Sequence, residues 1–265
     1  MRAKKSLGQN FLKSKAAVIE IIKVANLKPE DLVLEVGPGK GVLTEALLTT
    51  GAKVIAVEKD DRLIEQLQEK FSNEIKSGKF QLIHQDILNF DFENFYKLIP
   101  ISYKLIANIP YYITGTFLRK FLTAKLQPEL MVLMLQKEVA KRIVAKDGKE
   151  SLLSISVKAY GEPKYIKTVP AKYFSPAPKV DSAILLIKDI SRKIFHDNQI
   201  DEEKFFDLVR AGFAHKRKFL VSNLKEMAPI GAISWPEKFR SCGLSEKSRA
   251  EDLSLENWRS LVTSS

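Results

Sequence analysis

A possible reactive site begins where a predicted buried strand ends: the apolar run at residues 104–107 is followed by Asn108, Ile109, Pro110 and Tyr111. The Asn108 side-chain oxygen could accept one N–H of a base amine, and a backbone carbonyl at Ile109 or Pro110 could accept the other. Such an amine is a poor nucleophile because its lone pair is delocalised into the ring, so two acceptors would supply the geometry for attack on an electrophilic methyl group. Pro110 stiffens the turn, and Tyr111 could stack on an extruded base. A plain Asn-x-Pro turn with a core tyrosine is the alternative.

A glycine-rich turn follows an earlier apolar run, with Gly37, Gly39 and Gly41 in the order G-x-G-x-G. This spacing is not the dinucleotide fingerprint G-x-G-x-x-G. Glycines allow a ligand to approach the backbone closely, although a purely structural turn would use them too. The absence of a basic P-loop signature argues against a nucleoside triphosphate.

Two acidic residues end the next two predicted strands. Glu58 lies about 20 residues after the glycine turn, where an acid binds ribose hydroxyls in such folds, and Asp86 precedes Ile87. Successive parallel strands end at one edge of the sheet, which is where open α/β sheets bind ligands. The turn and the two acids together favour an adenosine-containing ligand.

The elements that position these residues alternate in type. Apolar runs predict strands at residues 32–36, 53–58, 80–87, 103–110 and 129–137, and amphipathic patterns between them include helices at 42–51 and 62–71. This alternation predicts an α/β domain with a mostly parallel sheet and helices on both faces. Residues 151–161, 165–170 and 182–188 predict further strands without long helices between them, and therefore an antiparallel edge.

The C-terminal part of the chain predicts a separate helical domain. Residues 188–204 are polar and predict a linker, and helical patterns follow at 202–213, 216–227, 235–243 and 254–262. Ser254 is a plausible cap for the last helix. We therefore divide the chain into residues 1–188 and residues 189–265.

Composition limits the possible function classes. The chain has 265 residues and a net charge of +11, which favours a polyanionic partner. One cysteine, Cys242, excludes a disulfide framework, and three scattered histidines predict no metal site. We expect no membrane span, signal peptide or transit peptide, and a cytoplasmic location. Candidate phosphate contacts are Lys4, Lys5, Lys13, Lys216, Arg217 and Lys218, although each could also belong to a solvated helix face.

Several motifs carry a family resemblance. The G-x-G-x-G turn and Asp86 resemble the class I S-adenosylmethionine-dependent methyltransferase fold, and "NIPY" resembles the motif of N6-adenine methyltransferases. The segments "KKSLGQNFL", "EVGPGKGVLTEALL", "QDIL" and "YFSPAPKVDSAIL" together resemble the ribosomal RNA adenine dimethyltransferases. The match extends from Lys4 to Leu261, almost the whole chain.

The resemblance implies a fold and a set of site residues. It implies a Rossmann-like seven-stranded sheet, an N-terminal segment over the cofactor and a small all-α C-terminal domain that contacts the RNA substrate. In that family the Glu holds the ribose and the Asp accepts from the adenine amino group. The residues implied to contact S-adenosylmethionine are Gln9, Asn10, Leu12, Gly37, Gly39, Glu58, Asp86, Ile87 and Asn108. Phe174 becomes a second aromatic candidate for holding the target adenine, with core packing as an equal alternative.

The resemblance also implies a reaction and a partner. Residues 208–224 and 242–254 are similar to the helical domain of the small-subunit branch, whereas Ile109 is common in the branch that methylates large-subunit RNA and confers macrolide resistance. We expect a monomer that acts on the 30S precursor. It would add two methyl groups to N6 of each of two adjacent adenosines in the 3′-terminal hairpin of 16S rRNA, with S-adenosylhomocysteine as the product and no metal.

With no RNA-recognition or KH signature in the chain, target selection is expected to depend on RNA shape and a splayed base. Three alternatives remain: 23S rRNA methylation, a non-catalytic RNA-binding assembly or transcription factor, and an NAD oxidoreductase, which the glycine spacing disfavours.

Overall fold

The computed structural model of this chain describes residue 4 and residues 7–90, 92–97, 102–227 and 233–263. The chain divides into two compact units. The first contains residues 1–140 and 162–190, and the second contains residues 141–161 and 191–265. The second unit thus includes residues 141–161, which precede the domain boundary predicted after residue 188. That boundary concerns what each part of the chain does, and it remains a prediction.

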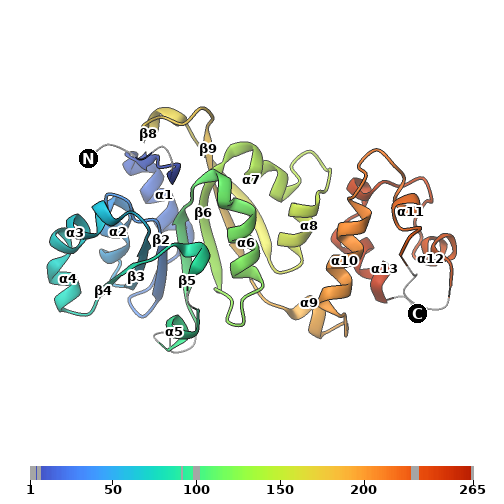
Figure 1. Cartoon of the computed structure of the whole chain (residues 1–265), viewed down its shortest axis with the longest axis horizontal. Coiled ribbons are helices and arrows are strands. Elements are labelled where there is room, and N and C mark those ends of the chain that lie inside the picture. Colours follow the sequence, from blue (N-terminus) through green and yellow to red (C-terminus); the bar gives the residue numbers. More distant parts are fainter. Residues whose placement is uncertain (1–3, 5–6, 91, 98–101, 228–232, 264–265) are drawn as a thin grey trace. The chain divides into compact units, whose positions relative to one another are not determined.

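The first unit is built on one seven-stranded sheet with the order β4-β3-β2-β5-β6-β9-β7 (Figure 1). Neighbouring strands from β4 to β6 are parallel, whereas β9 is antiparallel to both β6 and β7. This arrangement confirms the predicted parallel sheet with an antiparallel edge. The strands are β2 (Leu32–Val36), β3 (Lys53–Glu58), β4 (Phe80–His84), β5 (Lys104–Asn108), β6 (Leu130–Gln136), β7 (Glu162–Val169) and β9 (Ser182–Lys188).

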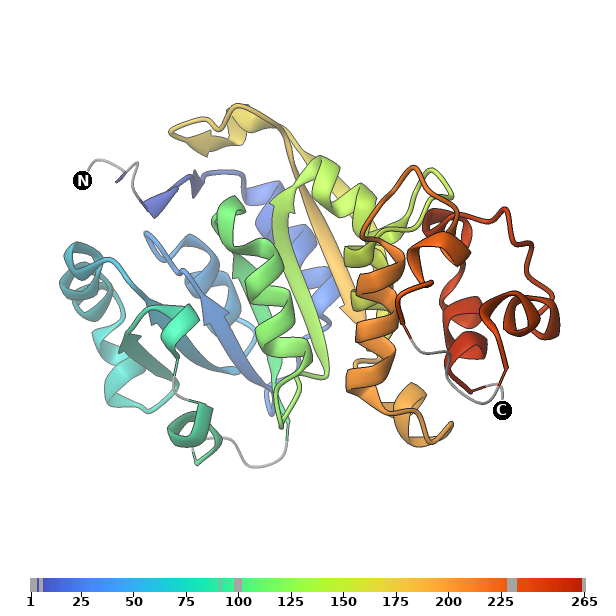
Figure 2. The same ribbon diagram turned by 45° about the vertical axis from the view of Figure 1, so that its right-hand side comes forward.

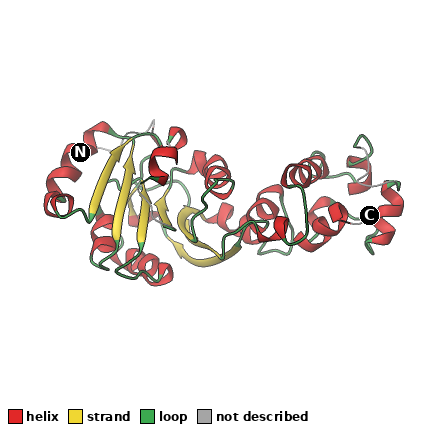
Figure 3. Ribbon diagram, turned by 90° about the horizontal axis from the view of Figure 1, so that it is seen from below, coloured by secondary structure: helices red, strands yellow, loops and turns green. Residues whose placement is uncertain are grey.

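The central strands are mostly apolar because helices lie on both sides of the sheet (Figure 3). On one face Ile21, Leu47 and Leu67 share a core with Val54 and Val132 of the strands. The helices of this unit are α1 (Lys15–Ala25), α2 (Val42–Leu48), α3 (Asp61–Lys70), α4 (Ser72–Lys76), α5 (Phe92–Tyr96) and α6 (Thr114–Leu122), with 3₁₀ turns η2 (Ile87–Asn89), η3 (Tyr111–Ile113) and η4 (Ala171–Tyr173). Helix α7 (Lys137–Val144) begins in this unit and ends in the second.

A two-stranded sheet joins the N-terminal segment to the segment before β9. Strand β1 (Phe11–Leu12) pairs antiparallel with β8 (Phe174–Ser175), so that Leu12 lies opposite Phe174. Helix α1 begins directly after β1, and Ser14 caps it by accepting the Ala17 N–H at 3.2 Å. The pairing fixes the N-terminal segment near the carboxyl ends of the parallel strands.

The second unit is helical, as predicted (Figure 2). Its elements are α8 (Leu152–Lys158), α9 (Lys193–His196), α10 (Glu202–Gly212), α11 (Leu220–Asn223), α12 (Trp235–Ser241), η5 (Ala250–Asp252) and α13 (Leu255–Thr263). Trp258 of α13 is fully buried and packs against α10 at Gly212, where a Cβ atom would lie 2.3 Å from the indole. Ser254 accepts the Asn257 N–H at 3.2 Å, which confirms the predicted cap.

Three predicted elements were wrong. Residues 152–158, predicted as part of a strand, form helix α8, because Ser151 and Ser154 make a capping box and bury one helical face at Ile155. The predicted linker contains α9, whose Phe195 is buried against aromatic rings of the same unit. The single helix predicted at 216–227 is reduced to the four residues of α11.

No helix within the described ranges is both long and apolar enough to cross a membrane.

Candidate functional site

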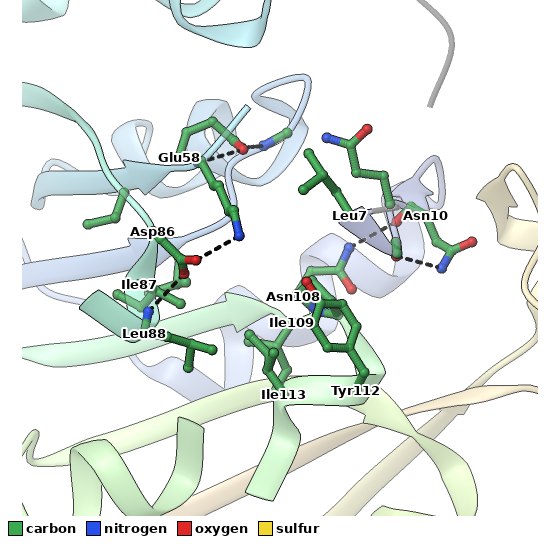
Figure 4. Close-up of a pocket in the computed structure, with 18 of the residues that line it drawn as sticks. Leu7, Asn10, Glu58, Asp86, Ile87, Leu88, Asn108, Ile109, Tyr112 and Ile113 are labelled. Carbon is green, nitrogen blue, oxygen red and sulfur yellow. Dashed lines mark hydrogen bonds and ion pairs between the residues drawn. The ribbon is translucent and has the colours of Figure 1, made fainter. Parts of the chain in front are cut away.

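A pocket opens at the carboxyl ends of the parallel strands in the first unit (Figure 4). The chain leaves β2 towards β3 on one side and later returns to form β5 on the other, so the strand order reverses between β2 and β5. Gly37 follows β2 and Asn108 ends β5, and a Cβ atom on Gly37 would lie 3.6 Å from the Asn108 carbonyl oxygen. Ligands of open α/β sheets bind at such a switch point.

Glu58 ends β3 and turns its carboxylate towards the glycine loop. Its oxygens accept three backbone N–H groups: those of Gly39 at 3.1 Å, Lys59 at 2.9 Å and Asp60 at 2.9 Å. Burial raises the pKa of Glu58, and the three hydrogen bonds offset only part of that rise. One lone-pair position on Oε2 is left for a hydroxyl donor in the pocket, since a carboxylate offers about four such positions.

Asp86 lies beside Glu58 at the end of the neighbouring strand (Figure 4). Its Oδ2 accepts from Lys59 Nζ at 2.7 Å and its Oδ1 accepts the Leu88 N–H at 3.0 Å. Burial raises the pKa of Asp86, but these two hydrogen bonds outweigh it and the pKa is lowered. Asp86 is therefore an ionised acceptor at neutral pH, with lone-pair positions left for further donors.

The N-terminal segment forms the opposite wall of the pocket (Figure 4). Gln9 is held in place because its Nε2 donates to Asp60 Oδ2 at 2.7 Å. Phe11 lies against the glycine turn, where a Cβ atom on Gly39 would come within 3.0 Å of its ring. A side chain at Gly39 would thus displace the segment that covers the pocket.

Asn108 has a fixed amide orientation. Its Nδ2 donates to the Asn10 carbonyl at 3.2 Å, which leaves Oδ1 as the exposed acceptor. Within the described ranges no group donates to Asn108 Oδ1 or to the Ile109 carbonyl, whereas the Pro110 carbonyl accepts the Ile113 N–H at 3.2 Å. The two open acceptors next to the pocket are therefore those of Asn108 and Ile109.

Two consecutive tyrosines follow these acceptors and differ in environment. The Tyr111 hydroxyl is 2.8 Å from Ser182 Oγ on β9, a contact that holds the ring as a rigid wall of the pocket. Tyr112 also lines the pocket but is 65% exposed, at its mouth. A flat base entering the pocket would meet aromatic surface on this side.

Glu35, on β2, is a buried carboxyl group close to the site. Its two oxygens and the neighbouring Thr44 hydroxyl lack hydrogen-bond partners among the described residues. Burial raises the pKa of Glu35 to about 8; the nearby Thr44 hydroxyl offsets part of this rise, and the charge of Glu58 adds a smaller contribution to it. Glu35 is therefore largely protonated at neutral pH and does not add to the negative charge of the pocket.

The pocket brings together most of the residues predicted from the sequence. It is lined by Gln9, Asn10, Gly37, Gly39, Glu58, Asp86, Ile87, Asn108, Pro110 and Tyr111. Leu12 and Phe174 do not line it; they face each other in the β1–β8 pair and are buried in the core, Phe174 with 2% exposure. A contact between Phe174 and a target base would require a rearrangement that uncovers its ring.

The basic candidates lie on the surface. Lys4 and Lys13 in the first unit, and Lys216, Arg217 and Lys218 in the second, are exposed. Lys4 lies 3.9 Å from Asp61. Lys5 falls outside the described residues.

Several residues that line the pocket were not predicted from the sequence. Lys59 follows Glu58 directly, but only the lateral pairing of β3 with β4 shows that it reaches Asp86. Tyr112 could have been noticed as a second aromatic after the Asn-Ile-Pro-Tyr motif. The other missed residues are Leu7, Gly8, Phe11, Val36, Val57, Gln85, Leu88 and Ile113.

The residues present fit an adenosine-containing cofactor. Glu58 and Asp86 are acceptors suited to hydroxyl and amino donors, and Val57, Ile87 and Leu88 supply apolar surface for a base. Gly37 has φ +71° and leaves the backbone open to a ligand. Within the ranges that the structure describes, no cluster of acids, histidines and cysteine could hold a metal ion.

Comparison with known proteins gives consistent results. The family model described as "Ribosomal RNA adenine dimethylase" matches residues 1–265. A "Ribosomal RNA small subunit methyltransferase A" of Dehalococcoides mccartyi is 46% identical, over 98% of this chain and 88% of its own. The protein of the same name from Fusobacterium nucleatum is 38% identical, over 98% and 96%.

Two solved structures match the chain along nearly its whole length. The dimethyladenosine transferase from Plasmodium falciparum has a TM-score of 0.79 and 26% identity, with 95% of both chains covered. The 23S rRNA methyltransferase ErmE has a TM-score of 0.74 and 24% identity, over 96% of this chain and 98% of its own. At that identity the likeness to ErmE indicates the fold alone.

Proposed function

Because the chain belongs to the ribosomal RNA adenine dimethylase family, we propose that it dimethylates N6 of two adjacent adenosines in the 3′-terminal hairpin of 16S rRNA during assembly of the small subunit. S-Adenosylmethionine is the proposed methyl donor and S-adenosylhomocysteine the product. The names of the relatives from Dehalococcoides and Fusobacterium support the small-subunit branch. The observation that carries the proposal is the pocket in which Asn108 Oδ1 is open beside Glu58 and Asp86.

The acids and the N-terminal segment would hold the cofactor. Glu58 would accept a ribose hydroxyl on its remaining lone pair, and Asp86 would accept from the adenine amino group while keeping its bonds to Lys59 and Leu88. Gln9 and Asn10 would cover the ligand from the opposite wall. When bound, the cofactor supplies an electrophilic methyl group on a sulfonium.

Asn108 and Ile109 would act on the target nitrogen. Their two oxygens would accept the two N–H groups of the adenine amine, which turns the nitrogen lone pair out of conjugation and fixes its direction. Tyr111, held by Ser182, would stack on the extruded base. After the first transfer only one N–H remains, so a single acceptor is enough to orient the amine for the second.

No dedicated base is required in this scheme. Methylation makes the nitrogen cationic and strongly acidic, so its proton can leave to water. We also propose that the protein works as a cytoplasmic monomer without a metal, and that the exposed cations Lys4, Lys13, Lys216, Arg217 and Lys218 contact RNA phosphates.

Replacement of Asn108 tests the proposed role. Asn108→Ala should abolish methyl transfer while it leaves RNA binding largely intact, because the basic residues remain. Asn73→Ala, which makes the same change on the exposed helix α4, is the matched control and should behave like the wild type. Near-normal turnover of the Asn108 variant would contradict the mechanism.

A further inference from the structure

The β1–β8 ribbon, defined as residues 11–13 and 172–180, has one buried side and one exposed side. Leu12 and Phe174 face the core, and the Lys13 N–H donates to the Tyr173 carbonyl at 2.8 Å, so the pairing continues beyond the strands. The side chains of Lys13 and Tyr173 are exposed, Tyr173 at 41%. Figures 1 and 2 both show β8 beside the N-terminal segment.

This ribbon is uniformly basic. Its charged residues are Lys13, Lys172 and Lys179, and the wider segments 7–18 and 170–180 contain no acidic residue. The next acid along the chain, Asp181, is engaged by the Ala171 N–H at 3.0 Å and by Lys137 at 3.8 Å. Among the described residues Lys13, Lys172 and Lys179 have no ion-pair partner, so their charges are available to an external anion.

Tyr173 adds an aromatic side chain to this basic ribbon. Lys172 Nζ lies 5.5 Å from the centroid of the Tyr173 ring. No described group forms a hydrogen bond with its hydroxyl, and Val180 nearby in the sequence is 45% exposed. An exposed ring with a lysine beside it is an arrangement that can bind an unpaired base and its phosphate.

The ribbon continues from the pocket wall. Gln9, Asn10 and Phe11 line the pocket, and Lys13 follows within about 10 Å of chain, since a strand rises about 3.3 Å per residue. A nucleotide strand that places one base in the pocket can therefore reach the ribbon with its neighbouring nucleotides.

We propose that the β1–β8 ribbon binds the single-stranded RNA adjacent to the target adenosine, with Tyr173 stacking on a neighbouring base and Lys13, Lys172 and Lys179 contacting phosphates. The inference rests on the proposed function and identifies the surface that receives the substrate strand. Single-stranded RNA is favoured over a duplex because a duplex keeps its base faces stacked on one another and unavailable to a tyrosine ring.

The test measures RNA affinity of the full-length chain by fluorescence anisotropy with a short fluorescein-labelled single-stranded RNA that contains two adjacent adenosines. Lys172→Gln/Lys179→Gln should weaken binding about tenfold at about 0.1 M salt and reduce the salt slope by about 1.4, since each phosphate contact contributes about 0.7. Lys76→Gln/Lys79→Gln removes the same charge at exposed positions next to the amino end of β4 and should leave affinity unchanged.

The stacking component is tested separately. Tyr173→Ala should weaken binding at least about fivefold, whereas Tyr173→Phe keeps the ring and should bind like the wild type. Unaltered affinity of the ribbon variants, or equal losses in the control, would overturn the inference, and so would equal, Tyr173-dependent binding of a duplex RNA. Thermal melting and S-adenosylmethionine titration of each variant confirm that it is folded.

The experiments distinguish a failure of this inference from a failure of the proposed function. If the wild type fails to methylate small subunits but the ribbon variants lose RNA affinity as described, the proposed function is wrong and the ribbon assignment stands. If the wild type methylates small subunits and the ribbon variants bind RNA normally, the ribbon assignment alone is wrong.

Discussion

Replacement of Glu58 by glutamine probes the proposed cofactor site with the smallest change of shape. The Glu58 carboxylate accepts three backbone N–H groups, including that of Gly39 in the glycine turn. A glutamine can keep the two bonds on one oxygen, to Lys59 and Asp60, but its amide nitrogen then faces the Gly39 N–H as a second donor. The Gly39 N–H of the turn then has no acceptor, and a bound ligand no longer meets a charged acceptor at residue 58.

The size of the effect follows from these contacts. An unsatisfied buried N–H costs about 1–3 kcal/mol, which should appear as reduced stability of the Glu58→Gln variant without ligand. A hydrogen bond from a ribose hydroxyl to a charged acceptor contributes about 1.5–3 kcal/mol, so cofactor affinity should fall about 10- to 150-fold. Because burial raises the pKa of Glu58, wild-type affinity should also decrease as the pH falls towards that raised value, and the variant should lack this decrease.

Isothermal titration with S-adenosylmethionine and S-adenosylhomocysteine measures the affinity, and urea unfolding measures the stability. Glu69→Gln, on the exposed side of α3, makes the same chemical change away from the pocket and serves as the control. If Glu58→Gln binds both ligands as tightly as the control does, Glu58 does not hold the cofactor and the assignment of the pocket is refuted.

Three further outcomes are expected. The folded chain keeps a proton on Glu35 up to about pH 8, whereas the unfolded chain releases it near the ordinary pKa of a glutamate, so the stability of the wild type falls as the pH rises between these two pKa values. Glu35→Gln should therefore be more stable than the wild type at pH 8 and about as stable at pH 5, as measured by urea unfolding at both pH values. Tyr111→Phe leaves the buried Ser182 hydroxyl without its partner and should cost about 1–3 kcal/mol of stability while the aromatic wall is retained, so transfer should persist in a methylation assay. Gly212→Ala should lower the melting temperature because its Cβ would overlap the core of the second unit, at a cost of about 1–3 kcal/mol, whereas Gly115→Ala in α6 meets nothing within 4 Å and should not lower it.

The parallel part of the fold was predictable because its strands are continuous apolar runs. A strand that helices cover on both faces is apolar on both sides, so it can be recognised from the sequence. Because parallel strands end at the same edge of the sheet, the positions of Gly37, Glu58, Asp86 and Asn108 at that edge could be predicted as well. Helix α8 was not predictable in the same way, since its alternating serines and apolar residues imitate a strand and only the Ser151 capping box marks the helix.

The remaining features depend on contacts between distant segments. The two-residue strands β1 and β8 are too short to show a period, and they pair across more than half of the chain. That pairing buries Phe174, which the sequence left equally open as a base contact or a core residue. The link between Lys59 and Asp86 likewise requires the lateral register of β3 and β4.

The most direct test of the central proposal locates the transferred methyl groups. The protein would be incubated with labelled S-adenosylmethionine and small ribosomal subunits from a strain that lacks the two dimethyladenosines, with large-subunit RNA in parallel, and the label mapped by primer extension. We predict N6,N6-dimethyladenosine at two adjacent positions in the 3′-terminal hairpin of the small-subunit RNA. Label confined to large-subunit RNA, or binding to small subunits without any transfer, would contradict the proposed function.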